Sequence, residues 1–95
     1  MSEKPDVIYI GRKPVMSYVL AVITSFSGSN AEKITLKARG RSITTAVDVA
    51  EITKRRFLKE LKIGKISIGT EEMPAREGES RPRMVSTMEI TLSRE

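Results

Sequence analysis

The sequence predicts a single α+β domain, a two-layer α/β sandwich in which one sheet packs against two helices in the order β-α-β-α-β-β. Its 95 residues can bury one modest core, but not two lobes with a cleft between them. Segments in which apolar and polar residues alternate, as in strands, are interleaved with two segments whose apolar residues recur at helical spacing. A long polar segment separates the last two strand patterns, which predicts an extended hairpin between the third and fourth strands.

The first strand and the first helix follow from two adjacent patterns. Residues 7–10 form a short β-branched and aromatic run that a glycine ends, which predicts a largely buried strand. Pro14 is favoured at the first position of a helix, because its missing N–H would be unpaired there in any case. Apolar residues recur at helical spacing as far as Phe26, and Gly28 suits a left-handed helix cap. We expect a helix from Pro14 to about Ser27.

The next segment predicts a second strand, a turn and a second helix. Residues 33–38 alternate strictly, which indicates a strand with one buried face. A basic turn over residues 39–42 follows, and Ser42 is expected to cap the next helix. The apolar residues on one face of that helix are Ile43, Ala46, Val47, Ala50, Phe57, Leu58 and Leu61. Val49 and Ile52 fall on the opposite side, as isolated exposed aliphatics or as a contact for a partner protein.

Two further strands are predicted at about residues 62–70 and 84–92. Residues 71–83 between them carry four Glu against three Arg, with two Pro and no periodicity, so we expect a mobile hairpin loop. Residues 1–6 are polar and are expected to be flexible.

The composition argues against catalysis and a membrane span. Cys and His are absent, which excludes disulfides and removes the commonest general base and metal ligand. Asp48 and Glu51 could bind Mg²⁺ in a nuclease, but Lys54 and Arg55 beside them favour ion pairing. We therefore expect no enzyme activity, cofactor, bound metal or small-molecule substrate. No apolar run approaches the roughly 20 residues of a membrane helix, and the polar N-terminus is unlike a signal peptide, so we expect a cytoplasmic protein.

The positive charge is concentrated in the first half of the chain. The net charge is +5, and six basic residues lie between Gly11 and Arg41 against one acid, Glu32. The remaining eleven basic and eleven acidic residues cancel. Concentrated positive charge attracts polyanions, although it can also serve solubility alone.

Two basic segments of this half are candidate phosphate-binding sites. Arg12 and Lys13 precede a helix, whose free N–H groups attract anions but whose dipole disfavours cations, so their presence points to function. Lys37, Arg39 and Arg41 lie on one side of an extended segment, and the glycine between the two arginines lets the backbone approach a ligand closely. The alternative for this second segment is a solvated turn.

The hairpin loop is a third candidate. Arg76, Arg81 and Arg83 belong to an arm that could enter a minor groove. The acid excess of the loop argues against it as the main anchor, so Arg81 and Arg83 at its root are the better candidates. Tyr18, near the first basic segment, could stack on a base of RNA.

Six short motifs in order resemble the Alba family of archaeal chromatin proteins, and the resemblance extends from about Val7 to Leu92. They stand at 10–16 (IGRKPVM), 18–21 (YVLA), 37–41 (KARGR), 46–48 (AVD), 56–58 (RFL) and 86–90 (STMEI). The resemblance implies a fold like the C-terminal domain of translation initiation factor three. It also implies a homodimer that binds DNA and RNA, with paired hairpin arms that reach along the groove.

The resemblance also assigns roles to single residues. The family's basic pair maps to Arg12 and Lys13, and its basic turn maps to Arg39 and Arg41. The aromatic residue of its dimer–dimer contact maps to Phe57, with Arg56 next to it. The family's acetylated lysine is here Arg12, which leaves Lys13 as the candidate for acetylation. The Glu-rich hairpin loop is a second departure from the family pattern.

Taken together, we expect a chromosome-associated protein that coats double-stranded DNA and also binds RNA. Phosphate contacts by Arg12, Lys13, Lys37, Arg39 and Arg41 would supply most of the affinity. The chain has one Asn, Asn30, and no Gln, so little sequence reading is expected. The alternatives are a ribonucleoprotein subunit or RNA chaperone, a nuclease that uses Asp48 and Glu51, and a protein-interaction module that uses Val49 and Ile52.

Overall fold

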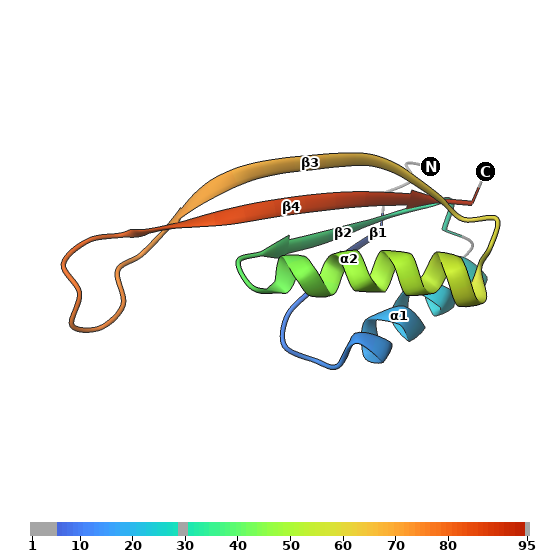
Figure 1. The fold of residues 1–95 in the computed structure, drawn as a ribbon, viewed down its shortest axis with the longest axis horizontal. Helices are drawn as coiled ribbons and strands as arrows, with labels where there is room; N and C mark the ends of the chain where they lie inside the picture. Colours follow the sequence, from blue (N-terminus) through green and yellow to red (C-terminus); the bar gives the residue numbers. More distant parts are fainter. Residues whose placement is uncertain (1–5, 29–30, 95) are drawn as a thin grey trace.

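In the computed structural model, which describes residues 6–28 and 31–94, one four-stranded sheet carries two helices on one face (Figure 1). The elements are β1 (Asp6–Tyr9), α1 (Val15–Gly28), β2 (Lys33–Arg39), α2 (Ser42–Ile52), the π-helical turn η1 (Thr53–Phe57), β3 (Lys62–Met73) and β4 (Arg83–Ser93). The strand order in the sheet is β1-β2-β4-β3, with β1 parallel to β2 and the other pairs antiparallel. This confirms the predicted class, the two layers and the order of elements.

The core lies between the helices and the inner face of the sheet. Strict alternation in β2 directs Ile34, Leu36 and Ala38 inward, and all three are buried. From α1 the buried residues are Tyr18, Val19, Val22 and Phe26, and from α2 they are Ala46, Val49 and Ala50. Each fully buried Val, Leu or Ile side chain contributes roughly 1.5–3 kcal/mol. No helix in the described part of the chain is long and apolar enough to cross a membrane.

The first strand is buried on one face only. Ile8 packs against the core, whereas Tyr9 is 73% exposed and Val7 is 38% exposed. The expectation of a largely buried strand was therefore wrong, because β1 is an edge strand and the helices cover one face of the sheet. Asp6 is the first residue of β1 and pairs with Ile34, and the rest of the segment expected to be flexible lies outside the described residues.

The buried face of α2 matches the prediction at Ala46 and Ala50 but differs from it at other positions. Val49 is fully buried, whereas Val47 is 41% exposed, and Ile52 packs against the core. The helix therefore buries Ala46, Val49 and Ala50, which lie three and four residues apart and share one face. Two small alanines on this face allow the helix backbone to approach its neighbours closely. A partner contact through Val49 and Ile52 is contradicted by this burial.

The end of α2 widens into the π-helical turn η1. The backbone N–H of Leu58 donates to the carbonyl of Thr53, five residues earlier, at 2.8 Å. A wider turn changes the angular position of the residues that follow it, and Phe57 is 47% exposed instead of lying on the predicted buried face. Leu61 remains fully buried.

Two predicted helix caps are absent. Ser42 is the first residue of α2, and Arg41 occupies the cap position without a side-chain hydrogen bond. Gly28 ends α1 as a helical residue, and the left-handed glycines of the described chain are Gly40 and Gly78. At the end of α1, the Arg94 side chain donates to the carbonyl of Phe26 at 2.8 Å and so satisfies one of the free carbonyls.

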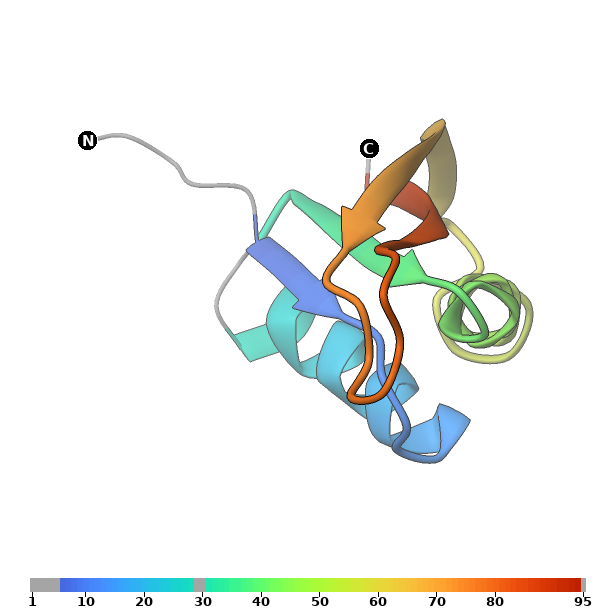
Figure 2. The same ribbon diagram turned by 90° about the vertical axis from the view of Figure 1, so that its left-hand side faces the viewer.

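The hairpin of β3 and β4 extends well beyond the helices (Figures 1 and 2). Pairing continues from Lys62 with Ser93 to Met73 with Arg83, with one irregularity between Ile63 and Ile66. The third strand is therefore longer than predicted, and the connecting loop is limited to residues 74–82. The mobility of this loop stays a prediction.

Candidate nucleic-acid interface

Three chain segments meet at one end of the sheet and form an open groove. Parallel pairing places the ends of β1 and β2 at the same side, and antiparallel pairing places the beginning of β4 there as well. The groove has a volume of about 1090 Å³. Its arginines are Arg12, Arg39, Arg41, Arg76 and Arg83, and none of the described residues that line it is acidic. The fold thus gathers cations from segments that are far apart in the sequence.

The turn between β2 and α2 is built around Gly40. Its φ of 58° is a left-handed conformation that side chains disfavour, and its N–H donates to the carbonyl of Ser86 at 2.8 Å. This bond fastens the turn to β4. The Ser42 hydroxyl donates weakly, at 3.4 Å, to the carbonyl of Gly11 and joins the turn to the loop after β1.

Tyr18 organises the loop that carries Arg12 and Lys13. Its side chain is 7% exposed, and its hydroxyl accepts hydrogen bonds from the N–H groups of Gly11 at 2.8 Å and Lys13 at 3.0 Å. The expectation that Tyr18 stacks on a base was wrong, because its ring is buried. These two amides are already hydrogen-bonded to Tyr18, so they are not free to bind an anion. An anion at this loop would therefore be bound mainly by the exposed side chains of Arg12 and Lys13.

Lys37 and Arg39 of β2 both lie on the outer face of the sheet, and Arg39 also lines the groove. Lys37 lies on the outer face of the sheet, 3.7 Å from Glu89, and is not part of the groove. The Arg39 guanidinium lies 2.9 Å from a carboxylate oxygen of Glu71 and donates to the sulfur of Met73 at 3.1 Å. Both pairs are partly exposed, and exposed ion pairs contribute only about 0–1 kcal/mol. A phosphate can therefore replace these carboxylates at little cost.

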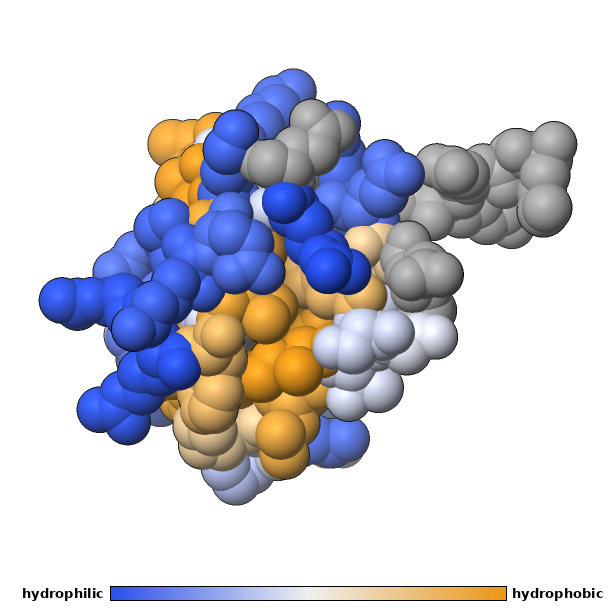
Figure 3. Space-filling model, turned by 90° about the vertical axis from the view of Figure 1, so that its right-hand side faces the viewer, coloured by the Kyte–Doolittle hydropathy of each residue, from blue (hydrophilic) through white to orange (hydrophobic). Residues whose placement is uncertain are grey.

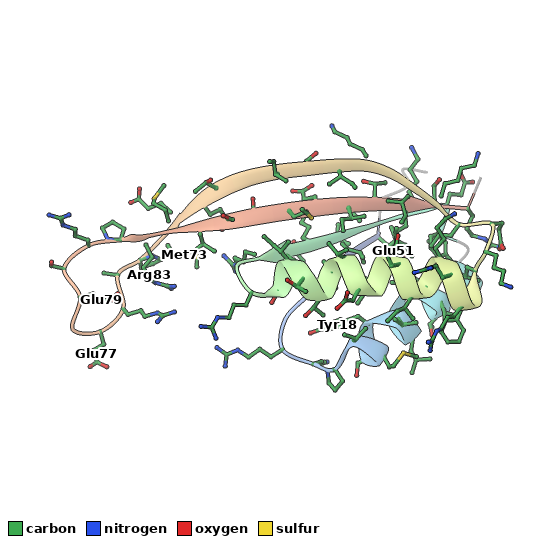
Figure 4. All side chains as sticks on the ribbon, in the orientation of Figure 1. Tyr18, Glu51, Met73, Glu77, Glu79 and Arg83 are labelled. Atoms are coloured by element: carbon green, nitrogen blue, oxygen red, sulfur yellow. The ribbon has the colours of Figure 1, made fainter. Side chains whose placement is uncertain are left out.

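The hairpin carries charges of both signs, but of its charged residues only arginines line the groove. Arg76 and Arg83 line the groove, and Nε of Arg83 is buried without a hydrogen-bond partner among the described residues. Figure 4 shows Arg83 beside Met73 at the root, with Glu77 and Glu79 farther out in the loop. Glu79 accepts a hydrogen bond from the backbone N–H of Arg76 at 3.2 Å.

The groove gathers most of the predicted binding residues, but not all of them. Arg81 lies in a shallow depression of the hairpin loop, and Lys13 is exposed outside the groove lining. The contacts of Arg39 with Glu71 and Met73 were not predicted from the sequence. Both partners lie on β3, and the predicted third strand ended at about residue 70. Arg39 and Glu71 are 32 positions apart in the chain, and no local sequence pattern indicates a contact between residues so far apart.

The carboxylates of α2 lie elsewhere. Asp48 and Glu51 line a surface depression together with Ile52, Arg55 and Arg56. Within the residues that the structure describes, no group of three His, Cys, Asp or Glu side chains is arranged to hold a metal ion.

Comparison with known proteins assigns the chain to a family. The sequence model of the family described as Alba matches residues 6–70. The chain is 49% identical to the DNA/RNA-binding protein Alba of Thermoplasma acidophilum and 44% identical to that of Picrophilus torridus, each over 89 residues that cover 94% of this chain and 96% of the relative.

Solved structures agree with this assignment. Alba from Thermoplasma volcanium superposes with a TM-score of 0.84 at 49% identity, and the match covers 94% of this chain and 100% of that one. ALBA1 from Trypanosoma brucei, at 18% identity, shares the fold with a TM-score of 0.70 over 97% of this chain and 71% of its own. The chain belongs to the Alba family.

Proposed function

We propose that this chain is an architectural chromatin protein that coats double-stranded DNA as a homodimer, with little sequence preference, and also binds RNA. The observation that carries the proposal is the groove in which five arginines converge without an acidic residue in the described lining. The names of the relatives, DNA/RNA-binding protein Alba, support nucleic acid as the ligand. On this proposal the protein is associated with the chromosome in the cytoplasm and has no catalytic role.

Phosphates suit this groove better than base edges do. A guanidinium can offer two parallel donors to a phosphate. The left-handed Gly40 has no side chain to keep a backbone phosphate away. The one side chain suited to reading adenine, Asn30, lies outside the described residues. Affinity would therefore depend on charge and little on sequence.

An uncovered apolar strip on the hairpin supports dimerisation. Ile66 and Ile68 of β3 and Met84 of β4 are 54%, 80% and 68% exposed. Ile66 pairs with the buried Ile90, so these side chains point to the helix side of the sheet, beyond the part that the helices cover. β3 is a twelve-residue edge strand, and a long apolar edge invites association. A second copy, related by a two-fold axis, can cover this strip and supply a second groove.

Coating of a duplex needs contacts between dimers as well. Phe57 is half exposed in η1, with Arg56 beside it, at the end of the molecule opposite the hairpin. Figure 3 views this end and shows hydrophobic residues at the surface between hydrophilic ones. We assign Phe57 and Arg56 to the contact between neighbouring dimers. Phe57→Ala should then lower the cooperativity of DNA binding and leave the dimer intact.

A salt titration tests the proposal directly. The logarithm of the affinity for duplex DNA should fall linearly with the logarithm of salt concentration, with a slope of about 0.9 per phosphate neutralised. Two unrelated duplexes of equal length should bind within a few-fold of each other. A flat salt response or a strong preference for one duplex contradicts the proposal. The affinity for duplex RNA, measured at the same salt concentrations, tests the alternative of a mainly RNA-directed role. Tighter binding to RNA than to DNA would favour that alternative.

A further inference from the structure

The outer face of the sheet, which the helices leave open, carries a large exposed aromatic ring. Tyr9 is 73% exposed at the end of β1, and its alternation with the inward-facing Ile8 and Ile10 places it on this face. Most of the other described side chains on this face are polar. An exposed tyrosine on a polar sheet presents a flat apolar surface with nothing packed on it, which suits a planar ligand.

Tyr9 borders a hollow of about 300 Å³ in this face. Strand pairing places Tyr9 next to Lys37, and Lys37 next to Glu89, in one row across the sheet. In the next row Arg39 pairs with Thr87, and Thr87 with Gly69. A Cβ on Gly69 would lie 3.2 Å from the hydroxyl oxygen of Thr87, so the glycine keeps that hydroxyl uncovered.

The polar groups around the hollow match those of a nucleotide. Lys37 and Arg39 supply donors for a phosphate, and the half-exposed carboxylates paired with them supply acceptors for the amino groups of a base. Thr87 can donate or accept. The two ion pairs are long or exposed, so either cation can turn to a phosphate at little cost.

The hollow shares one lining residue with the groove that the proposed function assigns to duplex phosphates. Arg39 lines both of them. A strand whose phosphates lie in the groove can therefore continue over Arg39 onto the outer face of the sheet. A duplex cannot place a base against Tyr9, because its bases are paired and stacked in its interior. The bases of a single strand are free to stack on the ring.

From this arrangement we infer that the outer face of the sheet is a second binding site, specific for single-stranded nucleic acid, in which an unpaired base stacks on Tyr9 and its phosphates contact Lys37 and Arg39. The inference rests on the proposed nucleic-acid function and adds a distinct ligand and a distinct surface to it. Stacking on an aromatic ring tolerates any base, so the site selects for unpaired strands and not for a sequence.

The test compares single strands with duplexes. The 95-residue protein and its Tyr9→Ala variant are titrated with an unstructured 12-nucleotide RNA, the DNA strand of the same sequence, and a blunt DNA duplex. Loss of one stacked base predicts that Tyr9→Ala binds both single strands about 5- to 100-fold more weakly. Affinity for the duplex should stay within about twofold of wild type, since stacking needs an unpaired base. Tyr9→Phe, which keeps the ring, should bind like the wild type.

Val7→Ala is the matched control. Val7 lies on the same strand and the same face, is also exposed, and does not line the hollow, so its loss should leave both affinities unchanged. A single strand that carries 5-iodouracil should also cross-link to Tyr9 on irradiation. The buried Tyr18 should not react, although the chain contains two tyrosines.

Each failure has a distinct meaning. If Tyr9→Ala binds single strands as tightly as the wild type, or if cross-links form elsewhere, the second site is refuted while the groove remains. If the variant loses duplex and single-strand binding equally, Tyr9 belongs to the groove or the fold, and the second site is again refuted. If the wild type binds duplex DNA without salt dependence, the proposed function fails, whatever the result at Tyr9.

Discussion

The groove and the outer face of the sheet both carry cations, but these cations differ in their neighbours. In the groove, Arg12 and Arg41 have no ion-pair partner among the described residues. On the outer face, Lys37 and Arg39 each face a carboxylate. A cation without a carboxylate partner gives a phosphate its full charge, whereas a paired one must first give up its carboxylate. The groove should therefore dominate duplex affinity, and the outer face should modify it.

The same contrast exists within the hairpin. Arg76 in the loop and Arg83 at the start of β4 line the groove, whereas Glu77 and Glu79 of the same loop do not. Over residues 71–83 four Glu exceed three Arg, but the charged residues of the hairpin that line the groove are arginines. Net charge over a segment is thus a poor guide to the charge of the face that meets a ligand.

Removal of the unpaired cations should have the largest effect. Arg12→Ala combined with Arg41→Ala removes two cations from each protomer, so in a dimer four phosphates are left without a partner. We expect duplex affinity to fall about 100-fold or more, with a salt slope lower by ~1 for each phosphate left unneutralised. The melting temperature should change little, because both side chains are exposed. Fluorescence anisotropy at several salt concentrations and a thermal melt measure the two quantities.

Arg55→Ala is the control for this pair, since Arg55 is exposed on η1 outside the groove. If the double variant binds the duplex as tightly as Arg55→Ala does, Arg12 and Arg41 do not contact DNA phosphates.

Disruption of the dimer should be the next largest effect. Ile68→Asp places a carboxylate in the apolar strip that a second copy is proposed to cover. The protein should become monomeric, and its affinity for a long duplex should fall about tenfold or more, because two linked grooves bind more tightly than one. Leu20→Asp, at an exposed apolar residue of α1, should stay dimeric. Sedimentation velocity distinguishes the two, and a wild type that is monomeric at micromolar concentration contradicts the proposed dimer.

Removal of a carboxylate that pairs with a cation should have a smaller effect and should raise, instead of lower, the affinity for duplex DNA. Glu71→Gln removes the charge that lies 2.9 Å from the Arg39 guanidinium. Since exposed ion pairs contribute about 0–1 kcal/mol, duplex affinity should rise about two- to fivefold. Glu77→Gln, in the outer part of the loop, removes the same charge without a contact to Arg39 and is the control. Equal gains in the two variants would mean that total charge, and not the pair, sets the affinity.

The fold could be predicted because its signals are local. Strict alternation in β2 and helical spacing in α1 each define an element without knowledge of its neighbours. The buried face of α2 could not be predicted in the same way, because Val47 and Val49 are both apolar and lie two residues apart. Only packing decides that Val49 is buried. The π-helical turn that exposes Phe57 has no sequence signal either.

The sequence indicated the arginines that line the groove, but not how the fold arranges them. The basic loop, the basic turn and the hairpin arginines were all candidates. Lys37 and Arg39 share one face of β2, but only Arg39, at the end of the strand, reaches the groove. The exposure of the two tyrosines could not be predicted for a related reason. Tyr18 follows the basic pair on the adjoining helix, but that helix turns it inward, and β1 turns Tyr9 outward.

The smallest expected effect concerns Lys13. Its side chain is exposed beside Arg12 but does not line the groove, and its backbone N–H is held by the Tyr18 hydroxyl at 3.0 Å. Lys13→Gln, which mimics acetylation, therefore removes a nearby charge without moving the loop. We expect duplex affinity to fall about two- to fivefold and the salt slope to fall by at most ~1 per protomer. Lys13→Arg should restore both values, since it keeps the charge. The melting temperature should be the same in all three proteins. If Lys13→Gln weakens binding as strongly as Arg12→Ala alone, Lys13 contacts a phosphate directly, and the binding surface extends beyond the groove to the start of α1.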